Sequence, residues 1–154
     1  MQKYDIVALG GTFDIIHDGH MKLLNKAFSI SNKAIIGLTS DELAAKKGKN
    51  LLKNYHQRFE SLKSVIEKNF PKSSYEISKL ENDFGPAVIE GSVQALVVSK
   101  ETSNKGILLN ELRSKGNLPP VEIVVVPMVL AKDGNTISTT RIKNSEIDSS
   151  GNLN

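Results

Sequence analysis

Short apolar runs alternate with amphipathic stretches along most of the chain, which is the pattern of strands alternating with helices. Four continuous apolar runs and one alternating run predict strands at 4–9, 33–39, 74–80, 93–99 and 121–128. Helical spacing and capping signals predict helices at 19–30, 41–46, 54–70 and 105–116, with shorter ones within 83–91 and around 137–142. Strand and helix therefore alternate from one end of the chain to the other.

This order predicts an α/β fold with a five-stranded parallel sheet, because strands that are apolar throughout must be covered on both faces. Right-handed crossovers make such a sheet a doubly wound, Rossmann-like domain. The 154 residues match the size of one ordinary domain. We therefore expect a single domain over 1–154, with a polar and loose tail from about residue 144.

Composition removes several classes of function. The chain has no cysteine, which excludes disulfides, thiolate zinc sites and cysteine nucleophiles. No apolar stretch approaches the ~20 residues that span a bilayer, and the N-terminus runs straight into a strand pattern, so we expect a cytoplasmic protein without membrane contact. The net charge is +3, aromatic residues make up 5% and tryptophan is absent. This favours a phosphorylated small-molecule ligand over nucleic acid.

The stretch "GGTFDIIHDGH" at 10–20 holds the most unusual set of residues, between the first strand and the first helix. Ligands of open α/β sheets bind beyond the carboxyl ends of the strands. Gly10 and Gly11 allow the backbone to approach a ligand closely. We expect the first turn of the following helix to offer free N–H groups and the positive end of the helix dipole. The stretch therefore predicts a phosphate cradle.

The two histidines of this stretch support the same interpretation. His17 and His20 are three residues apart, so they share one face of a helical turn. They could donate hydrogen bonds to phosphate oxygens or carry positive charge in a transition state, and Thr12 adds a hydroxyl donor. The alternatives are ordinary helix caps or a metal pair. A protein metal site is not expected, because His56 is the only other histidine and no cysteine exists.

Two motifs resemble the signatures of one enzyme superfamily. The stretch 10–20 is similar to T-x-D-x-x-H-x-G-H of the nucleotidyltransferases that share the "HIGH" motif with class I aminoacyl-tRNA synthetases. "ISTTRI" at 137–142 is similar to the second signature, ISSTR. "VVSKET", "VEIVVVPMVLAKDG" and "EIDSSGNL" resemble archaeal-type phosphopantetheine adenylyltransferases, and the resemblance runs from about Tyr4 to Leu153.

The resemblance implies an activity. Such enzymes transfer the adenylyl group of ATP to 4'-phosphopantetheine, giving dephospho-CoA and pyrophosphate in coenzyme A biosynthesis. The acceptor phosphate attacks the α-phosphorus directly, so the protein positions groups and stabilises charge. Mg²⁺ would arrive with ATP, and no organic cofactor is implied. The alternatives are a cytidylyltransferase or FAD synthetase of the same superfamily, a nucleotide-binding module without catalysis, and an RNA-handling synthetase fragment.

The resemblance also implies roles for the residues of both signatures. Thr12 would orient the α-phosphate or the attacking phosphate, while His17 and His20 would hold the triphosphate and stabilise the transition state. The remaining implied nucleotide contacts are Gly10, Gly11 and Phe13 in the floor of the site and Ser138, Thr139, Thr140 and Arg141 around the phosphates. For the last four, a plain helix N-cap is the alternative. Thr139 replaces the second serine of the signature and keeps its hydroxyl.

A basic loop and the helix after it complete the expected site. Relatives carry a mobile lysine near the acceptor phosphate, and three residues of "KKGKNLLK" compete for this role: Lys47 as a catalytic residue, Lys46 and Lys49 as acceptor contacts. Arg58 matches an arginine of relatives and would also contact the acceptor. Solvated loop and helix charges are the alternative. Bacterial enzymes carry an "RGLR"-like segment where this chain has "VSKETSNKG", so we carry over no bacterial contacts from it.

Overall fold

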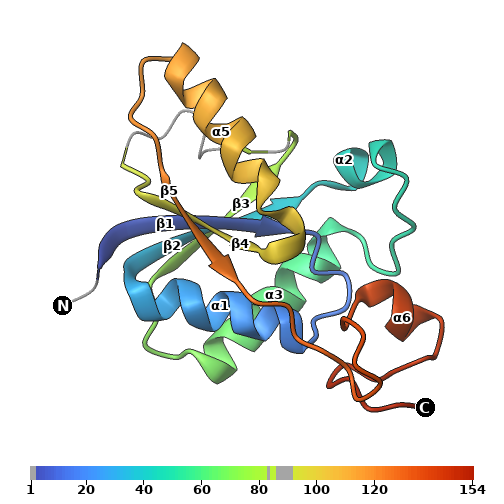
Figure 1. Cartoon of the computed structure of the whole chain (residues 1–154). Coiled ribbons are helices and arrows are strands. Elements are labelled where there is room, and N and C mark those ends of the chain that lie inside the picture. Colours follow the sequence, from blue (N-terminus) through green and yellow to red (C-terminus); the bar gives the residue numbers. More distant parts are fainter. Residues whose placement is uncertain (1–2, 83, 86–91) are drawn as a thin grey trace.

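The computed structural model describes residues 3–82, 84–85 and 92–154 (Figure 1). The elements in chain order are β1 (Tyr4–Gly11), α1 (Asp18–Ile30), β2 (Ser31–Thr39), α2 (Asp41–Lys46), α3 (Tyr55–Asn69), β3 (Tyr75–Leu80), β4 (Ala95–Ser99), the 3-10 turn η1 (Lys100–Thr102), α5 (Asn104–Lys115), β5 (Glu122–Val126) and α6 (Thr139–Lys143). The short helix expected within 83–91 falls almost entirely outside the described residues. The other expected elements are present, with boundaries shifted by a few residues.

The sheet has the order β3-β2-β1-β4-β5, and all neighbouring strands are parallel. The predicted five-stranded parallel sheet is thus confirmed. The strand order reverses between β1 and β4, which is where open α/β sheets form their ligand crevice. The carboxyl ends of the strands point toward the side of the molecule that carries α2 and α6 (Figure 1).

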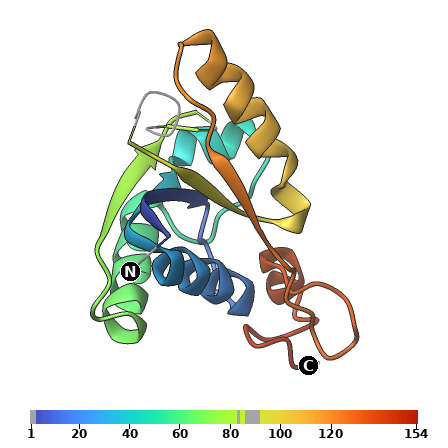
Figure 2. The same cartoon turned by 60° about the vertical axis from the view of Figure 1, so that its left-hand side comes forward.

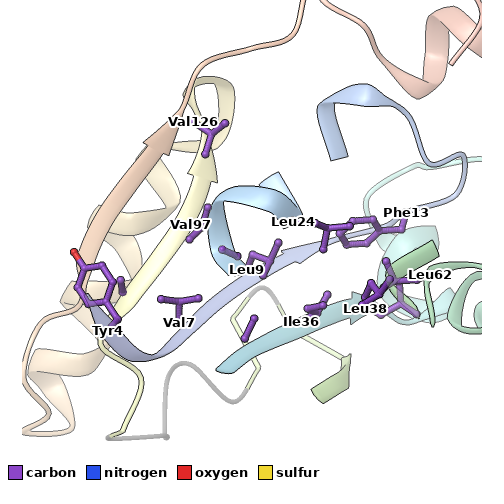
Figure 3. Packing of buried hydrophobic residues seen from close by; sticks show 14 residues of the cluster. Tyr4, Val7, Leu9, Phe13, Leu24, Ile36, Leu38, Leu62, Val97 and Val126 are labelled. Carbon is purple, nitrogen blue, oxygen red and sulfur yellow. The ribbon is translucent and has the colours of Figure 1, made fainter. Parts of the chain in front are cut away.

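Helices cover both faces of the sheet: α1 and α3 lie on one face and α5 on the other (Figures 1 and 2). Side chains of β1 alternate between these layers. Val7 and Leu9 pack into a core with Leu24 of α1 and Leu62 of α3, which Figure 3 shows from close by. Ala8 faces the second core, which contains Leu109 of α5. Burial on both faces explains why the strands are apolar throughout.

Strand β5 ends at Val126, two residues earlier than the apolar run predicts, because Pro127 has no N–H to continue the ladder. Residues 127–154 then leave the sheet and carry α6 and the C-terminus beside its carboxyl edge (Figures 1 and 2). This part has its own apolar cluster of Ala131, Ile137 and Ile147.

The expectation of a loose tail is wrong. Ile147 is only 1% exposed, and residues Ile147 and Leu153 form an antiparallel bridge. The Lys132 N–H donates to the Gly151 carbonyl at 2.9 Å, which ties the tail to the loop before α6. Polar composition was misleading here because one buried isoleucine and a hydrogen-bonded turn are enough to order so short a segment. Within the described residues no helix is long and apolar enough to cross a membrane.

Candidate active site

A cavity of about 690 Å³ lies at the carboxyl edge of the sheet, at the switch between β1 and β4. Its volume is that of a small-molecule site. The lining residues fall within 10–14, 17–23, 48–51, 99–105, 126–129 and 137–144. The two signature motifs, which are more than 100 residues apart in the sequence, therefore meet at one cavity.

The β1–α1 turn has a strained backbone that places an aromatic ring beside the histidine pair. Phe13 has φ of 50°, in the left-handed region that bulky residues rarely adopt, and its side chain is 1% exposed. Its ring centroid lies 4.8 Å from that of His20. Burial of the ring compensates the backbone strain, and the turn holds His20 at the edge of the cavity.

The two histidines cap the helix and face the cavity at the same time. His17 Nδ1 accepts from the Gly19 N–H at 3.1 Å, and His20 Nδ1 accepts from the His17 N–H at 3.2 Å. The rings stack with centroids 3.9 Å apart. Because each Nδ1 is an acceptor, each neutral ring carries its proton on Nε2. The helix-cap alternative is confirmed, and it leaves one N–H on each imidazole to donate to a ligand.

Electrostatics favour neutral imidazoles in this site. Burial lowers the pKa of His17, although Asp18 opposes the shift. Burial, together with the charges of His17 and Lys49, lowers the pKa of His20 to about 3. Both rings are therefore hydrogen-bond donors near neutral pH. Of the two roles that the sequence allowed, phosphate hydrogen bonding is favoured over carrying positive charge.

The first turn of α1 does not offer the free N–H groups that we expected. The Asp18 N–H donates to the Ser149 carbonyl at 3.1 Å, and the Gly19 N–H is used by His17. A Cβ on Gly19 would lie 2.8 Å from Cε1 of His17, so only glycine lets the imidazole fold over the turn. The donors for an anion are thus the Nε2–H groups, in place of the backbone groups.

Of the three candidate lysines, the structure brings only Lys49 into the lining. Lys49 Nζ donates to Thr12 Oγ1 at 2.9 Å. Lys46 is exposed at the end of α2, and Lys47 forms the C-cap of that helix; neither lines the cavity. Burial and the charges of Lys47, Lys105 and Lys143 lower the pKa of Lys49. This crowding of cations attracts a polyanion.

Arg58 does not line the cavity, which differs from the expected acceptor contact. The guanidinium is fully buried and pairs with Asp41 Oδ1 at 2.8 Å. Its other hydrogen bonds go to the carbonyls of Thr12 at 3.0 Å, Thr39 at 2.7 Å and Lys53 at 3.2 Å. Arg58 therefore fixes the backbone at Thr12. Its helical spacing to the buried Leu62 was a signal that it faces the interior.

Asp14 is a site residue to which the sequence analysis assigned no role, although the first signature contains it. Its carboxylate is buried, accepts from the N–H groups of Leu52 at 2.9 Å and Lys53 at 3.0 Å, and pairs with Lys143 Nζ at 2.8 Å. Burial opposes ionisation, but these hydrogen bonds and the charge of Lys143 lower the pKa of Asp14 overall. Asp14 thus links the basic loop to α6.

The second signature contributes hydroxyls and a different cation from the expected one. Ser138 and Thr139 line the cavity, and Ser138 Oγ accepts from the Arg141 N–H at 3.2 Å. The Arg141 guanidinium pairs with Asp133 and Glu146 and does not line the cavity; Lys143 does. The positive charge of Arg141, which we expected to contact the phosphates, is therefore neutralised by these two carboxylates. Thr140 lies in α6, and its side chain is outside what the structure describes.

Metal binding by the protein alone has no support in the part of the chain that the structure describes. Over residues 3–82, 84–85 and 92–154, no three His, Asp or Glu side chains gather as metal ligands. The one buried carboxylate in the lining, Asp14, is already paired with Lys143. The lining offers donors for phosphate oxygens instead of carboxylate ligands for a cation.

A parallel sheet with a switch-point cavity between two such signatures is the architecture of nucleotidyltransferases. The chain belongs to the cytidylyltransferase-like family, whose model matches residues 8–145. Within that family it belongs with the phosphopantetheine adenylyltransferases. It is 43% identical to the Methanosarcina acetivorans enzyme over 96% of this chain and 94% of the relative, and 36% identical to the Methanothermobacter thermautotrophicus enzyme over 99% and 91%.

Solved structures agree with this fold. A protein of unknown function from Archaeoglobus fulgidus superposes with a TM-score of 0.71 at 30% identity, over 79% of this chain and 88% of that one. Tyrosyl-tRNA synthetase from the same organism superposes with a TM-score of 0.65 at 12% identity, over 92% of this chain and 60% of that one. The second likeness shows that the fold is shared with synthetases.

Proposed function

We propose that this protein transfers the adenylyl group of ATP to 4'-phosphopantetheine, forming dephospho-CoA and pyrophosphate. The observation that carries the proposal is the meeting of Thr12, Lys49 and the Nε2–H groups of His17 and His20 at one cavity in a chain of this family. These groups are donors and cations, as two phosphorylated substrates require.

In the proposed reaction, an oxygen of the acceptor phosphate attacks the α-phosphorus of ATP. The new P–O bond forms as the bond to the bridging oxygen of pyrophosphate breaks, and that oxygen leaves with the electron pair. The protein supplies no nucleophile. Lys49 and Thr12, which already contact each other, orient the attacking and α-phosphates. The imidazole Nε2–H groups donate to the oxygens that gain charge in the transition state.

The second signature and its neighbours suit the leaving group. The Ser138 and Thr139 hydroxyls and the Lys105 ammonium line the same cavity and provide donors for the β- and γ-phosphates. Mg²⁺ held by the triphosphate would supply further charge neutralisation. Its ligands would come chiefly from ATP, because the Asp14 carboxylate is paired with Lys143.

The test is product formation with purified protein, ATP, Mg²⁺ and 4'-phosphopantetheine, followed as pyrophosphate release and as dephospho-CoA by mass spectrometry. We expect turnover with ATP far above that with CTP, which separates this activity from cytidylyl transfer. Lys49→Ala should lower kcat/KM for the acceptor by about 10–100-fold, because a charge at a positioned phosphate is lost. Lys46→Ala, on the exposed end of α2, is the matched control. No dephospho-CoA at saturating substrates contradicts the proposal.

A further inference from the structure

The last residues of the chain form a compact turn beside the cavity. We name residues 146–153 the C-terminal clasp. Its two ends meet in the antiparallel bridge between Ile147 and Leu153, and the Asp148 N–H donates to the Asn152 carbonyl at 2.9 Å.

One side of the clasp is fixed to the segment that leads into the second signature. Ile147 is buried with Ala131 and Ile137, and Ile137 immediately precedes Ser138. Gly151 has φ of 83°, and a Cβ there would lie 2.8 Å from Cδ1 of Ile137 and 2.9 Å from Cα of Ala131. The clasp therefore packs so closely on this segment that only glycine fits at residue 151.

The other side of the clasp is fixed to the first signature. The Ser149 carbonyl accepts the first N–H of α1, from Asp18, at 3.1 Å. Asp18 lies between His17 and Gly19, and the Gly19 N–H donates to His17 Nδ1 and so orients the His17 ring. The clasp thus contacts the histidine turn and the ISTTR segment at once.

The Asp148 side chain holds the turn that presents the Ser149 carbonyl to α1. Its Oδ1 accepts from the N–H groups of Ser150 at 3.0 Å and Asn152 at 2.9 Å, and its Oδ2 accepts from the Asn152 side chain at 3.0 Å. These hydrogen bonds lower the pKa of Asp148, so the carboxylate is ionised near neutral pH. They hold together the turn that presents the Ser149 carbonyl.

We propose that the C-terminal clasp is a positioning element of the active site, with Asp148 as its positioning residue. The clasp sets the distance between the imidazoles of His17 and His20 and the hydroxyls of Ser138 and Thr139. Neither side of the clasp needs to touch substrate for this role. A displacement of about 1 Å between groups that act on the same phosphates costs rate even when binding survives.

The test compares Asp148→Ala with Asp148→Asn and with the control Asp5→Ala. Asp5 also accepts a side-chain hydrogen bond, from Asn32 at 2.9 Å, but lies at the start of β1, at the opposite end of the sheet. Asparagine at 148 keeps an acceptor for the Ser150 and Asn152 N–H groups. We expect Asp148→Ala to lower kcat about tenfold with both KM values within about threefold, Asp148→Asn to restore most of the rate, and Asp5→Ala to match the wild type.

Two further measurements separate positioning from simple stability. The long-range ¹⁵N spectrum of the imidazoles, recorded without substrate, should show shifted His17 and His20 signals in Asp148→Ala and unshifted ones in Asp5→Ala. Gly151→Ala displaces the side of the clasp that packs on Ile137. It should also lower kcat and shift the His17 and His20 signals. Wild-type kcat and wild-type imidazole signals in both clasp variants, with only a lower Tm, would overturn the inference.

The kinetic readout rests on the proposed function, whereas the imidazole spectrum does not. If the wild-type protein makes no dephospho-CoA, the proposed function fails. The spectra of Asp148→Ala and Gly151→Ala still decide whether the clasp sets the histidine pair.

Discussion

Each imidazole of the histidine pair uses its two nitrogens for different purposes. His17 Nδ1 accepts from the Gly19 N–H, and His20 Nδ1 accepts from the His17 N–H, so both rings are fixed by the backbone they cap. The Nε2–H of each ring is then oriented before any ligand arrives. Such preorganised donors are worth more in a transition state than donors that must be ordered first.

This division of roles gives a prediction that separates capping from chemistry at His20. His20→Asn keeps an acceptor near the position of Nδ1 but has no group at Nε2, whereas His20→Ala loses both. Both variants should lower kcat by about 10²–10³-fold, as for the loss of one oxyanion donor, and change KM for ATP less. Only His20→Ala should also lose about 1 kcal/mol of stability, because the acceptor that completes the capping box with His17 is lost.

Steady-state kinetics with thermal unfolding of the same samples checks this prediction. Full activity in His20→Asn would show that the ring is a cap alone. Equal loss of stability in both variants would show that asparagine does not replace the cap.

At the residue scale, the sequence identified the right turn but not how its atoms are used. The strand–glycine–histidine pattern at 10–20 predicted the cavity, and Lys49, Ser138 and Thr139 do line it. Arg58 was expected to contact the acceptor and Arg141 the phosphates, yet both are paired with carboxylates. Their partners, Asp41 and Asp133, come from other turns, and spacing along one element does not reveal such pairs.

At the scale of elements, α3 supports the site through one buried charge. Arg58 lies on the same stripe as Leu62 and Ile66 and reaches the carbonyls of Thr12 and Thr39, where the chain leaves β1 and β2. Asp41, at the start of α2, is its ionic partner. The helix therefore holds the loop after β1 and the loop after β2 in a fixed relation.

Loss of this charge should destabilise the fold more than it changes substrate contacts. Arg58→Met removes the donor from the buried carbonyl of Thr39 and the half-buried carbonyl of Thr12, and the cation from Asp41. We expect a loss of about 1–3 kcal/mol in the free energy of unfolding by urea, as when a buried acceptor loses its donor, because the Asp41 carboxylate is itself half-exposed. Lys63→Met, an exposed position on the same helix, is the control and should change stability by less than about 0.5 kcal/mol.

A loss below 1 kcal/mol in Arg58→Met would contradict the structural role. In that case the expected contact with the acceptor would regain support, and KM for 4'-phosphopantetheine should rise in its place.

Element order and sheet type followed from periodicity because both are dictated by local burial. The C-terminal clasp could not be found this way. Its order depends on Ile147 meeting Ala131 and Ile137, and on a backbone carbonyl meeting the N-terminus of α1. These are long-range contacts of a mostly polar segment, which no window of the sequence displays.

For the whole molecule, burial of the neutral histidine pair links stability to pH. The pKa of His20 falls from its usual 6.5 to about 3 on folding, and burial also lowers that of His17. A group whose pKa is lower in the folded state binds protons more readily when unfolded. The stability that comes from burying the neutral His20 imidazole is therefore fully present above about pH 6.5 and is lost as the pH falls toward about 3.

Urea unfolding of wild type and His20→Asn between pH 8 and pH 4 should reveal this pH dependence of the free energy of unfolding. Buried carboxylates such as Asp14 add their own acid sensitivity, since the pKa of Asp14 is also lowered, but they do so equally in both proteins. The stability of the wild type should thus fall more steeply below pH 6.5 than that of His20→Asn. His56→Asn, on the exposed side of α3, should keep the wild-type profile. Parallel profiles for wild type and His20→Asn would mean that the pKa of His20 does not fall on folding, so that the imidazole of the folded protein carries positive charge below about pH 6.5.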